Sequence, residues 1–224
     1  TSQYGPDWGE GTSKSGNLYV LPDRTDPSNK ATRFHYDYRN RLIEVEETTT
    51  YGEETPTWST VARYYYDGKN LRVKKDLDTG TDVVYLYDGW QVLEEREYDS
   101  GDSAWEPRRQ YVYGGRYIDE VVIFDTDTDD DGSCVDDGGS ARYLYAQQAN
   151  WNVVAVADSG GEVAERIEYD PYGSATVSQE AGYSATGNPY LFQGRRWDEE
   201  SGLYYFRNRM MSPVLGACVI LGYV

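Results

Sequence analysis

The segment Tyr64-Tyr65-Tyr66-Asp67-Gly68-Lys69-Asn70-Leu71-Arg72-Val73 decides the fold of this chain. In an extended strand Tyr64 and Tyr66 lie on one face, because successive side chains point to opposite faces. Asp67 favours a turn, since its side chain accepts hydrogen bonds from the backbone that follows, and Asn70 tolerates the positive φ of a tight turn. Alternating residues then resume at Leu71 as a returning strand. The segment therefore predicts a β-hairpin.

This tyrosine–aspartate pattern recurs along the chain. Its key tyrosines are Tyr36, Tyr66, Tyr87, Tyr113, Tyr145 and Tyr169, separated by 30, 21, 26, 32 and 24 residues, and an aspartate follows four of them. A single hairpin is marginally stable in water, whereas successive hairpins form one sheet with a continuous aromatic face. We therefore predict an all-β fold, a curved strip of successive antiparallel β-hairpins with little helix. The stretch most favourable to a helix is 178–183.

The composition favours a folded β-protein and argues against several classes of partner. The chain has 224 residues, of which 23 are tyrosine and 6 are tryptophan, whereas disordered acidic chains are poor in aromatic residues. Its 21 basic and 39 acidic residues give a net charge of −18, which argues against binding to nucleic acid or to an anionic membrane surface. The longest apolar run, 214–224, is too short to cross a bilayer as a helix, so no membrane insertion is expected.

Four segments differ in composition. Residues 1–33 are an extended lead-in rich in Gly, Ser, Pro and Asp, and residues 34–173 carry the repeated hairpins. Residues 174–216 contain a second, non-repeated motif, and residues 217–224 form an apolar tail without a charged residue. The chain begins with threonine and shows no signal peptide, so we interpret it as a piece of a longer protein.

Few residues are suited to catalysis. The one histidine, His35, lies in an alternating stretch and is interpreted as an ordinary strand residue, which argues against a Ser-His-Asp or Cys-His centre. Two cysteines, Cys134 and Cys218, are too few for a disulfide framework or a cysteine metal site. Glycosidases use two carboxylic acids for catalysis, and adjacent acids such as Glu94-Glu95 could supply them. In a chain with 39 acidic residues, however, such adjacent pairs are expected by chance. We therefore predict a protein without enzymatic activity.

The acidic run 125–132 has the spacing of metal ligands. Asp127, Asp129 and Asp131 occupy positions 1, 3 and 5 of a calcium loop, and Gly132 occupies the turn position 6. Position 12 lacks the glutamate of an EF-hand, so this is not an EF-hand. Calcium is the candidate cofactor, with Asp127, Asp129 and Asp131 as its ligands. The alternative is a solvated acidic loop between two strands.

The tryptophans allow two interpretations. Aromatic platforms suit the faces of sugar rings, and Trp58, Trp90, Trp105 and Trp151 are the candidates for such a glycan-binding surface. The other interpretation is that these rings stack within the sheet.

The chain has one positively charged cluster. It consists of Arg195, Arg196, Arg207 and Arg209, which flank several aromatic residues. We interpret these arginines as structural, forming local ion pairs with Asp198, Glu199 and Glu200 or stacking on the rings.

The repeats resemble the YD repeats of bacterial RHS-repeat proteins, and the C-terminal half resembles the RHS repeat-associated core. The core-like motif is Asn188-Pro-Tyr-Leu-Phe-Gln-Gly-Arg-Arg-Trp-Asp-Glu-Glu-Ser-Gly-Leu-Tyr-Tyr-Phe-Arg-Asn-Arg209, and residues 149–173 resemble the entry to that core. The similarity covers residues 34–216, and the core-like motif is long and ordered enough to be specific.

The resemblance implies an architecture and a set of partners. RHS and YD-repeat proteins wind a ribbon of hairpins into a hollow shell that holds a variable C-terminal toxin. The expected partners are therefore other segments of a larger shell or a toxin cargo, and the expected location is secreted or cell-surface. A chain of this length implies a partial YD-repeat shell with part of its plug, rather than a closed cage.

The resemblance also raises the question of self-cleavage. Many members carry an aspartyl self-cleavage centre beyond the core motif. Here no acidic residue follows Glu200, so self-cleavage is disfavoured. We expect a non-catalytic structural scaffold, with a carbohydrate-binding surface module as the first alternative and a self-cleaving aspartyl protease region as the second.

Overall fold

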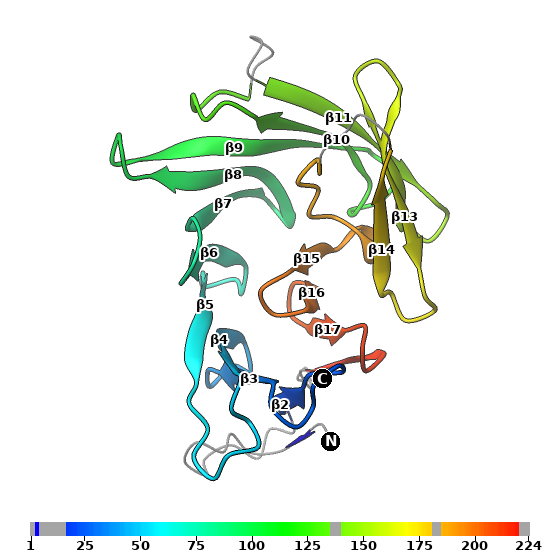
Figure 1. Ribbon diagram of the computed structural model, residues 1–224. Coiled ribbons are helices and arrows are strands. Elements are labelled where there is room, and N and C mark those ends of the chain that lie inside the picture. Colours follow the sequence, from blue (N-terminus) through cyan, green and yellow to red (C-terminus); the bar gives the residue numbers. More distant parts are fainter. Residues whose placement is uncertain (1–2, 5–16, 135–139, 181–184, 220–224) are drawn as a thin grey trace. The chain divides into compact units, whose positions relative to one another are not determined.

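The computed structural model describes residues 3–4, 17–134, 140–180 and 185–219, which are almost entirely β-structure (Figure 1). Apart from one 3₁₀ turn, η1 (Phe192–Gly194), these ranges contain no helix, and the all-β prediction is confirmed. The helical expectation for 178–183 is wrong where it can be compared, because Ser178 and Gln179 belong to strand β14 (Ala175–Gln179). Residues 181–184 of that stretch lie outside the described ranges.

The chain forms two compact units. The first unit comprises Thr1–Thr81, Asp198–Ser212 and Gly216–Val224, and the second comprises Asp82–Trp197 and Pro213–Leu215. None of the helical turns in the described ranges has the length and apolar character needed to cross a membrane.

The first unit is a run of antiparallel strands in chain order. Its strands are β1 (Gln3–Tyr4), β2 (Leu18–Pro22), β3 (Ala31–Tyr36), β4 (Leu42–Thr48), β5 (Ser59–Tyr66) and β6 (Arg72–Leu77), each paired with the next. A small second sheet follows near the C-terminus. It contains β16 (Leu203–Tyr205), β17 (Met210–Ser212) and β18 (Ala217–Cys218).

The second unit continues the same pattern. Its strands are β7 (Val83–Asp88), β8 (Gln91–Asp99), β9 (Ala104–Tyr113), β10 (Val121–Asp127), β11 (Ser140–Gln147), β12 (Val153–Asp158), β13 (Val163–Tyr169) and β14. Each pairs antiparallel with the next. In Figure 1 this sheet bends, so that β13 and β14 run across the direction of β8 and β9. The chain leaves the unit within β15 (Arg196–Asp198).

The turns have the chemistry that the repeated aspartates predict. Asp67 Oδ1 accepts hydrogen bonds from the backbone N–H groups two and four residues later, both at 2.8 Å. Asn70 holds the left-handed position of this turn with a φ of 66°. The turns that begin at Asp37 and Asp170 repeat both backbone hydrogen bonds. The aspartate of each of these repeats therefore closes its own hairpin.

The tyrosine before the turn links one hairpin to the strand before it. In four repeats its hydroxyl donates a hydrogen bond to a backbone carbonyl 16 to 24 residues earlier. The pairs are Tyr36 to Leu18, Tyr66 to Leu42, Tyr113 to Val92 and Tyr169 to Val153, at 2.8, 2.7, 3.1 and 2.6 Å. Each tyrosine thus uses its ring in the sheet and its hydroxyl to satisfy a backbone acceptor.

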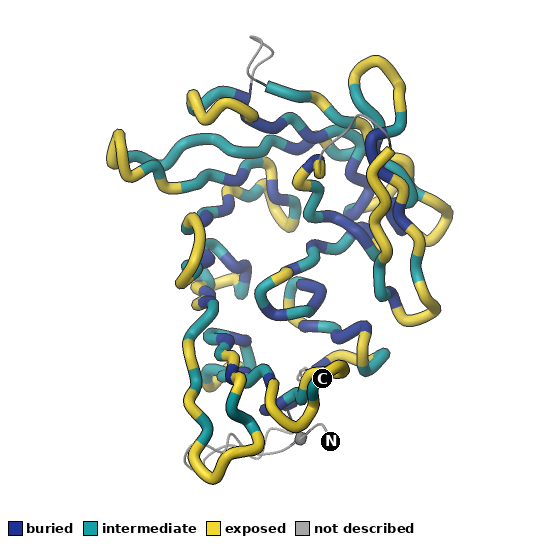
Figure 2. Tube along the Cα trace, viewed as in Figure 1, coloured by how far each residue is buried: buried dark blue, intermediate teal, exposed yellow. Residues whose placement is uncertain are grey.

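The core of each unit lies along one face of its strands. Phe34, Val45 and Ala62 are buried in the first unit, and Tyr111 and Phe124 are buried in the second. Figure 2 shows buried positions recurring along the strands, while the hairpin turns are exposed. This face is the one on which a later part of the chain packs.

Candidate functional site

Residues 185–212, here called the returning segment, pack against the hairpin strands of each unit. In the second unit the ring of Tyr190 lies edge-on to that of Tyr111, with centroids 5.1 Å apart. The backbone N–H of Val153 donates to the carbonyl of Leu191 at 3.1 Å. Asn152 Oδ1 accepts a hydrogen bond from the backbone of Gln193 at 2.8 Å. Rings and main chain therefore both fix the path of this segment.

A buried carboxylate anchors the returning segment in the second unit. Glu95, on β8, has an exposure of 0% and pairs with both terminal nitrogens of Arg196. Tyr111 donates its hydroxyl to Glu95 at 2.6 Å, and Arg109 lies 3.3 Å away. Burial alone would raise the pKa of Glu95, but the charges of Arg196 and Arg109 outweigh it and hold that pKa at about 2. Glu95 is therefore ionised at neutral pH.

An ion pair of the opposite polarity anchors the segment in the first unit. Here the sheet supplies the cation, Arg72, and the returning segment supplies the anion, Asp198, with exposures of 1% and 0%. Their bond is bidentate, with N–O distances of 2.6 and 2.7 Å. The rings of Tyr64 and Tyr205 lie 4.8 and 4.4 Å from the guanidinium carbon. Removing either partner of this pair would strongly destabilise the fold, because the other partner would remain as a buried unpaired charge.

Two further contacts reinforce the first-unit anchor. Glu200 accepts a hydrogen bond from the hydroxyl of Tyr64 at 2.7 Å and lies 3.2 Å from the ammonium group of Lys75. Burial, together with the nearby charges of Glu200 and Asp198, raises the pKa of Tyr64, so this phenol stays protonated.

Two arginines of the predicted cluster form ion pairs, but with acids distant in sequence, and the guanidinium carbon of Arg196 also lies 4.9 Å from the ring centre of Tyr85, as the stacking alternative predicts. Arg196 pairs with Glu95 and Arg195 pairs with Asp119, at 2.8 Å, so neither relies on the acids next to it in sequence. Asp198 pairs instead with Arg72. In an extended chain neighbouring side chains point apart, which leaves each of them free to reach a partner on the sheet.

The structure brings together the three predicted calcium ligands. Carboxylate oxygens of Asp127, Asp129 and Asp131 lie within 4.8 Å of one another. Asp127 also accepts backbone hydrogen bonds from Asp129, Asp130 and Gly132, at 3.1, 2.9 and 3.0 Å, so it organises the loop itself. Local desolvation, followed by the charges of Asp131 and Asp127, raises the pKa of Asp129, although the residue is exposed. This arrangement suits a cation, and calcium binding stays a prediction.

A neighbouring strand adds an acidic side chain that the sequence pattern does not reveal. Glu106, on β9, forms a second group of acidic side chains with Asp99 and Asp102. Burial and the charges of Asp99, Asp102, Asp127 and Asp131 raise the pKa of Glu106. Glu106 thus lies between the two groups. Because β8, β9 and β10 are neighbours only in the folded sheet, local spacing could not have identified it.

The three candidate tryptophans of the second unit do not form one platform. Trp90 lies in the turn before β8, whereas Trp105 packs on Tyr98 near the far end of that strand, with centroids 5.3 Å apart. Trp151 stacks on Tyr117 at 5.0 Å. Trp58 belongs to the first unit, where the guanidinium group of Arg33 lies 4.3 Å from its ring. Three of the four tryptophans therefore pack on neighbouring side chains.

The remaining residues considered for chemistry have ordinary surroundings. His35 is a strand residue of β3, as predicted, and its Nε2 lies 2.5 Å from Glu46. Cys134 and Cys218 are free thiols, and burial raises the pKa of Cys134 to about 11. A thiol with so high a pKa is a poor nucleophile at neutral pH.

Comparison with known proteins identifies relatives that are much longer. No family model matches the chain. It is 28% identical to the tRNA3(Ser)-specific nuclease WapA of Bacillus spizizenii, over 92% of this chain and 9% of that protein. It is 29% identical to the probable deoxyribonuclease RhsA of Dickeya dadantii, over 84% of this chain and 12% of that protein. The chain thus spans about a tenth of these relatives, and its homologues include RHS-family proteins.

Solved structures share the fold. A crystal structure of TcdB2-TccC3-TEV superposes with a TM-score of 0.61 and 19% identity, over 84% of this chain and 9% of that one. The Photorhabdus luminescens Tc holotoxin pore gives a TM-score of 0.60 and 15% identity, over 100% of this chain and 12% of that one. The β-hairpin ribbon is therefore a fold that also occurs in Tc toxin chains.

Proposed function

We propose that this chain is a non-catalytic structural scaffold, a part of an RHS/YD-repeat shell or its plug. In the longer protein such a shell encloses a C-terminal toxin or mediates interactions at the surface. The RHS-family homologues and the shared fold of Tc toxin chains support this proposal. The nuclease activities named for the relatives are theirs, and the chain matches only 9 to 12% of their length.

The observation that carries the proposal is the anchored returning segment. A scaffold needs a rigid wall, and buried bidentate ion pairs at Glu95 and Asp198 fix this segment to the sheet of each unit. Both carboxylates are buried and paired with arginines. Neither therefore has the access to water that an acid or base catalyst needs.

The proposed partners follow from the same role. We infer that the chain contacts other segments of a larger shell or a toxin cargo, and that it acts outside the cell or at its surface. Its net charge of −18 disfavours a nucleic-acid partner for this stretch.

Two measurements on the purified chain test the proposal. Incubation with tRNA and with plasmid DNA should leave both intact, since the scaffold has no catalytic role. Hydrogen exchange should show slow exchange at the amide of Val153, which donates to the returning segment, and faster exchange after Glu95→Gln. Degradation of either substrate, or exchange at Val153 as fast in the wild type as in an unfolded chain, contradicts the proposal.

Calcium binding by the acidic loop is a second candidate function. It is favoured by the convergence of Asp127, Asp129 and Asp131 and by the charge that crowds Glu106. A bound divalent ion would neutralise this crowding of negative charge.

Carbohydrate binding and self-cleavage have less support. For carbohydrate binding, the stacked pair of Tyr117 and Trp151 is a local aromatic surface, with Arg116 beside it. For self-cleavage, Asp170 is occupied in capping its turn and Asp198 is buried against Arg72.

A further inference from the structure

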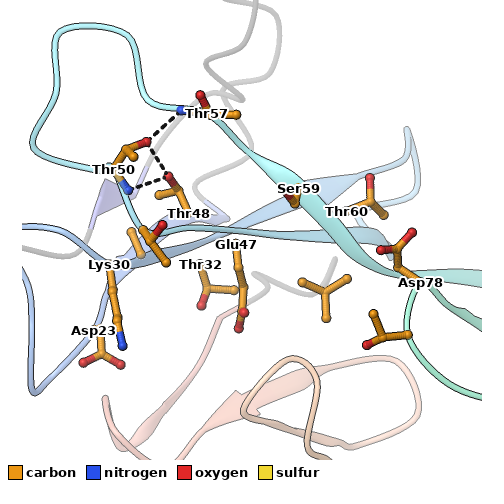
Figure 3. Close-up of a pocket in the computed structure, with 14 residues that line it drawn as sticks. Asp23, Lys30, Thr32, Glu47, Thr48, Thr50, Thr57, Ser59, Thr60 and Asp78 are labelled. Carbon is orange, nitrogen blue, oxygen red and sulfur yellow. Dashed lines mark hydrogen bonds between the residues drawn. The ribbon is translucent and has the colours of Figure 1, made fainter.

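The first unit contains a polar pocket that the anchors and the acidic loop do not explain (Figure 3). It has a volume of about 610 Å³ and lies where β3 begins, β4 ends and β5 begins. Threonine and serine hydroxyl groups dominate its lining, together with the carboxylates of Asp23, Glu47 and Asp78 and the ammonium group of Lys30. A pocket of this size accommodates a small molecule or the side chains of a peptide.

Three polar side chains form a row along one wall. Cross-strand pairing places Thr32 beside Glu47, and Glu47 beside Ser59. Two residues farther along the same face, the pair Phe34 and Val45 is fully buried. The apolar face thus becomes polar at the strand ends, and Figure 3 shows Thr32 and Glu47 side by side, with Asp23 and Lys30 at one end and Asp78 at the other.

The polar groups of this row are open to a ligand. In the part of the chain that the structure describes, the side chains of Thr32, Glu47, Ser59 and Asp78 make no hydrogen bond or ion pair, and Glu47, Ser59 and Asp78 are exposed to solvent. Glu46, the neighbour of Glu47, instead pairs with basic side chains on the opposite face. The pocket therefore presents a carboxylate that is flanked by two hydroxyl groups and has no counter-ion among the described residues.

We propose that this pocket binds a primary ammonium group, supplied by a free polyamine or by a lysine side chain of a partner protein. An ammonium group has three N–H donors. The row offers the carboxylate of Glu47 between the hydroxyl oxygens of Thr32 and Ser59, with neighbouring side chains about 5 Å apart across the strands. Hydrogen bonds between an ammonium group and a carboxylate are among the stronger ones in proteins.

The rest of the pocket fits a ligand with more than one amino group. Asp78, at the end opposite Lys30, is a second carboxylate that forms no ion pair with any described residue. The excess of carboxylates over Lys30 disfavours an anionic ligand, and the protein's net charge of −18 attracts cations. This inference is independent of the scaffold function, because the pocket lies apart from both anchors in the chain and uses none of their residues.

Calorimetric titration of the whole chain with spermidine at pH 7 and low ionic strength tests the proposal. We expect saturable binding that weakens roughly tenfold with Glu47→Gln, the usual effect of losing one charged hydrogen bond. Asp78→Asn should weaken it as well. The matched control is Glu53→Gln, which removes the same charge at an exposed glutamate outside the pocket and should leave binding unchanged. Equal losses with Glu47→Gln and Glu53→Gln would show general attraction to an acidic surface and overturn the proposal.

Further ligands separate an ammonium site from other sites. Triethylene glycol, a neutral chain of similar length, should not bind, and calcium at the same concentration should not displace spermidine. Binding of triethylene glycol, or displacement of spermidine by calcium, would contradict the proposal. Thr32→Val keeps every charge but removes one acceptor, so it should also weaken binding. A Gly-Lys-Gly peptide that binds more tightly than spermidine assigns the ammonium group to a protein partner, and weaker binding assigns it to a polyamine.

Discussion

At the scale of single residues, the buried anchors place opposite charges on the sheet and on the returning segment. Glu95 is an anion of the sheet that meets a cation of the segment, and Arg72 is a cation of the sheet that meets an anion. Buried pairs of this kind contribute little net stability compared with apolar side chains, yet a wrong register would leave charges unpaired. We therefore regard the anchors as devices that specify the register of residues 196 and 198.

The first prediction concerns the loss of one anchor. Glu95→Gln leaves Arg196 buried beside a neutral amide, so the free energy of unfolding should fall by about 3 to 5 kcal/mol in urea titrations. The matched control is Glu168→Gln, an exposed glutamate of β13, which should change stability by less than about 0.5 kcal/mol. Similar values for the two variants would show that the Glu95 anchor does not matter for stability.

The same residue gives a prediction for pH. The pKa of Glu95 is about 2 in the folded state against 4.5 for the unconstrained side chain, so the unfolded state binds the proton more readily. The contribution of Glu95 is therefore complete above pH 4.5 and is lost as the pH falls from 4.5 towards 2. The free energies of unfolding of the wild type and of Glu95→Gln, measured as the pH is lowered, should converge over this range. A constant difference between them would contradict the low pKa assigned to Glu95.

Calcium gives a third prediction. Because desolvation and the neighbouring charges of Asp131 and Asp127 raise the pKa of Asp129, ionising this group opposes folding as the pH rises, and a bound cation should reverse that effect. Millimolar calcium should raise the melting temperature at pH 7, and Asp129→Ala should abolish the shift. Asp26→Ala serves as the control, since it removes an aspartate from another turn. No shift in the wild type favours the solvated loop.

At the scale of elements, two features recur among the hairpins: an aspartate-capped turn, and, in four repeats, a tyrosine bonded to an earlier strand. Asn70 occupies a left-handed position with a φ of 66°, which a β-branched residue resists. Asn70→Val should therefore lower the free energy of unfolding by about 1 to 2 kcal/mol. Asn70→Gly, which suits that φ, should be close to neutral, and chemical denaturation of both variants would distinguish strain from loss of the asparagine side chain.

The tyrosine has a separate test. Tyr66→Phe keeps the ring but leaves the carbonyl of Leu42 without its donor, so it should cost about 0.5 to 1.5 kcal/mol. Tyr38→Phe, at a tyrosine that is 80% exposed, is the matched control and should have no measurable effect. An equal effect at both positions would contradict a role for the hydroxyl of Tyr66.

The elements also show what could be predicted from the sequence. Strand, turn and repeat depend on near neighbours, so the alternation around Tyr66 and the turn at Asp67 were predicted correctly. The partner of Arg196 was not, because Glu95 is 101 residues earlier and nothing near Arg196 specifies it. The same holds for Glu106, which meets the acidic loop only through the pairing of β9 with β10. Local periodicity contains no information about contacts of this range.

At the scale of the whole molecule, the chain should remain intact. No acid follows Glu200, and the earlier aspartates considered for cleavage are used in a turn and in an anchor. Purified protein should therefore keep its full mass for days between pH 5 and pH 7, as measured by mass spectrometry. A specific cut near Leu215 that disappears with Asp170→Asn would show that the catalytic carboxylates lie elsewhere than we expect.

The hydroxyl bonds that connect four repeat tyrosines to an earlier strand have a consequence for how such a chain can change in length. Removing two consecutive strands preserves the direction of the following strands and the face on which their side chains lie. It also leaves the next tyrosine hydroxyl with a backbone carbonyl of an equivalent strand to bond. Removing a single strand would reverse the direction of everything downstream and turn its buried side chains outward. Insertions and deletions are thus tolerated only as whole pairs of strands, so recombination between repeats would change such a gene in increments of 21 to 32 codons.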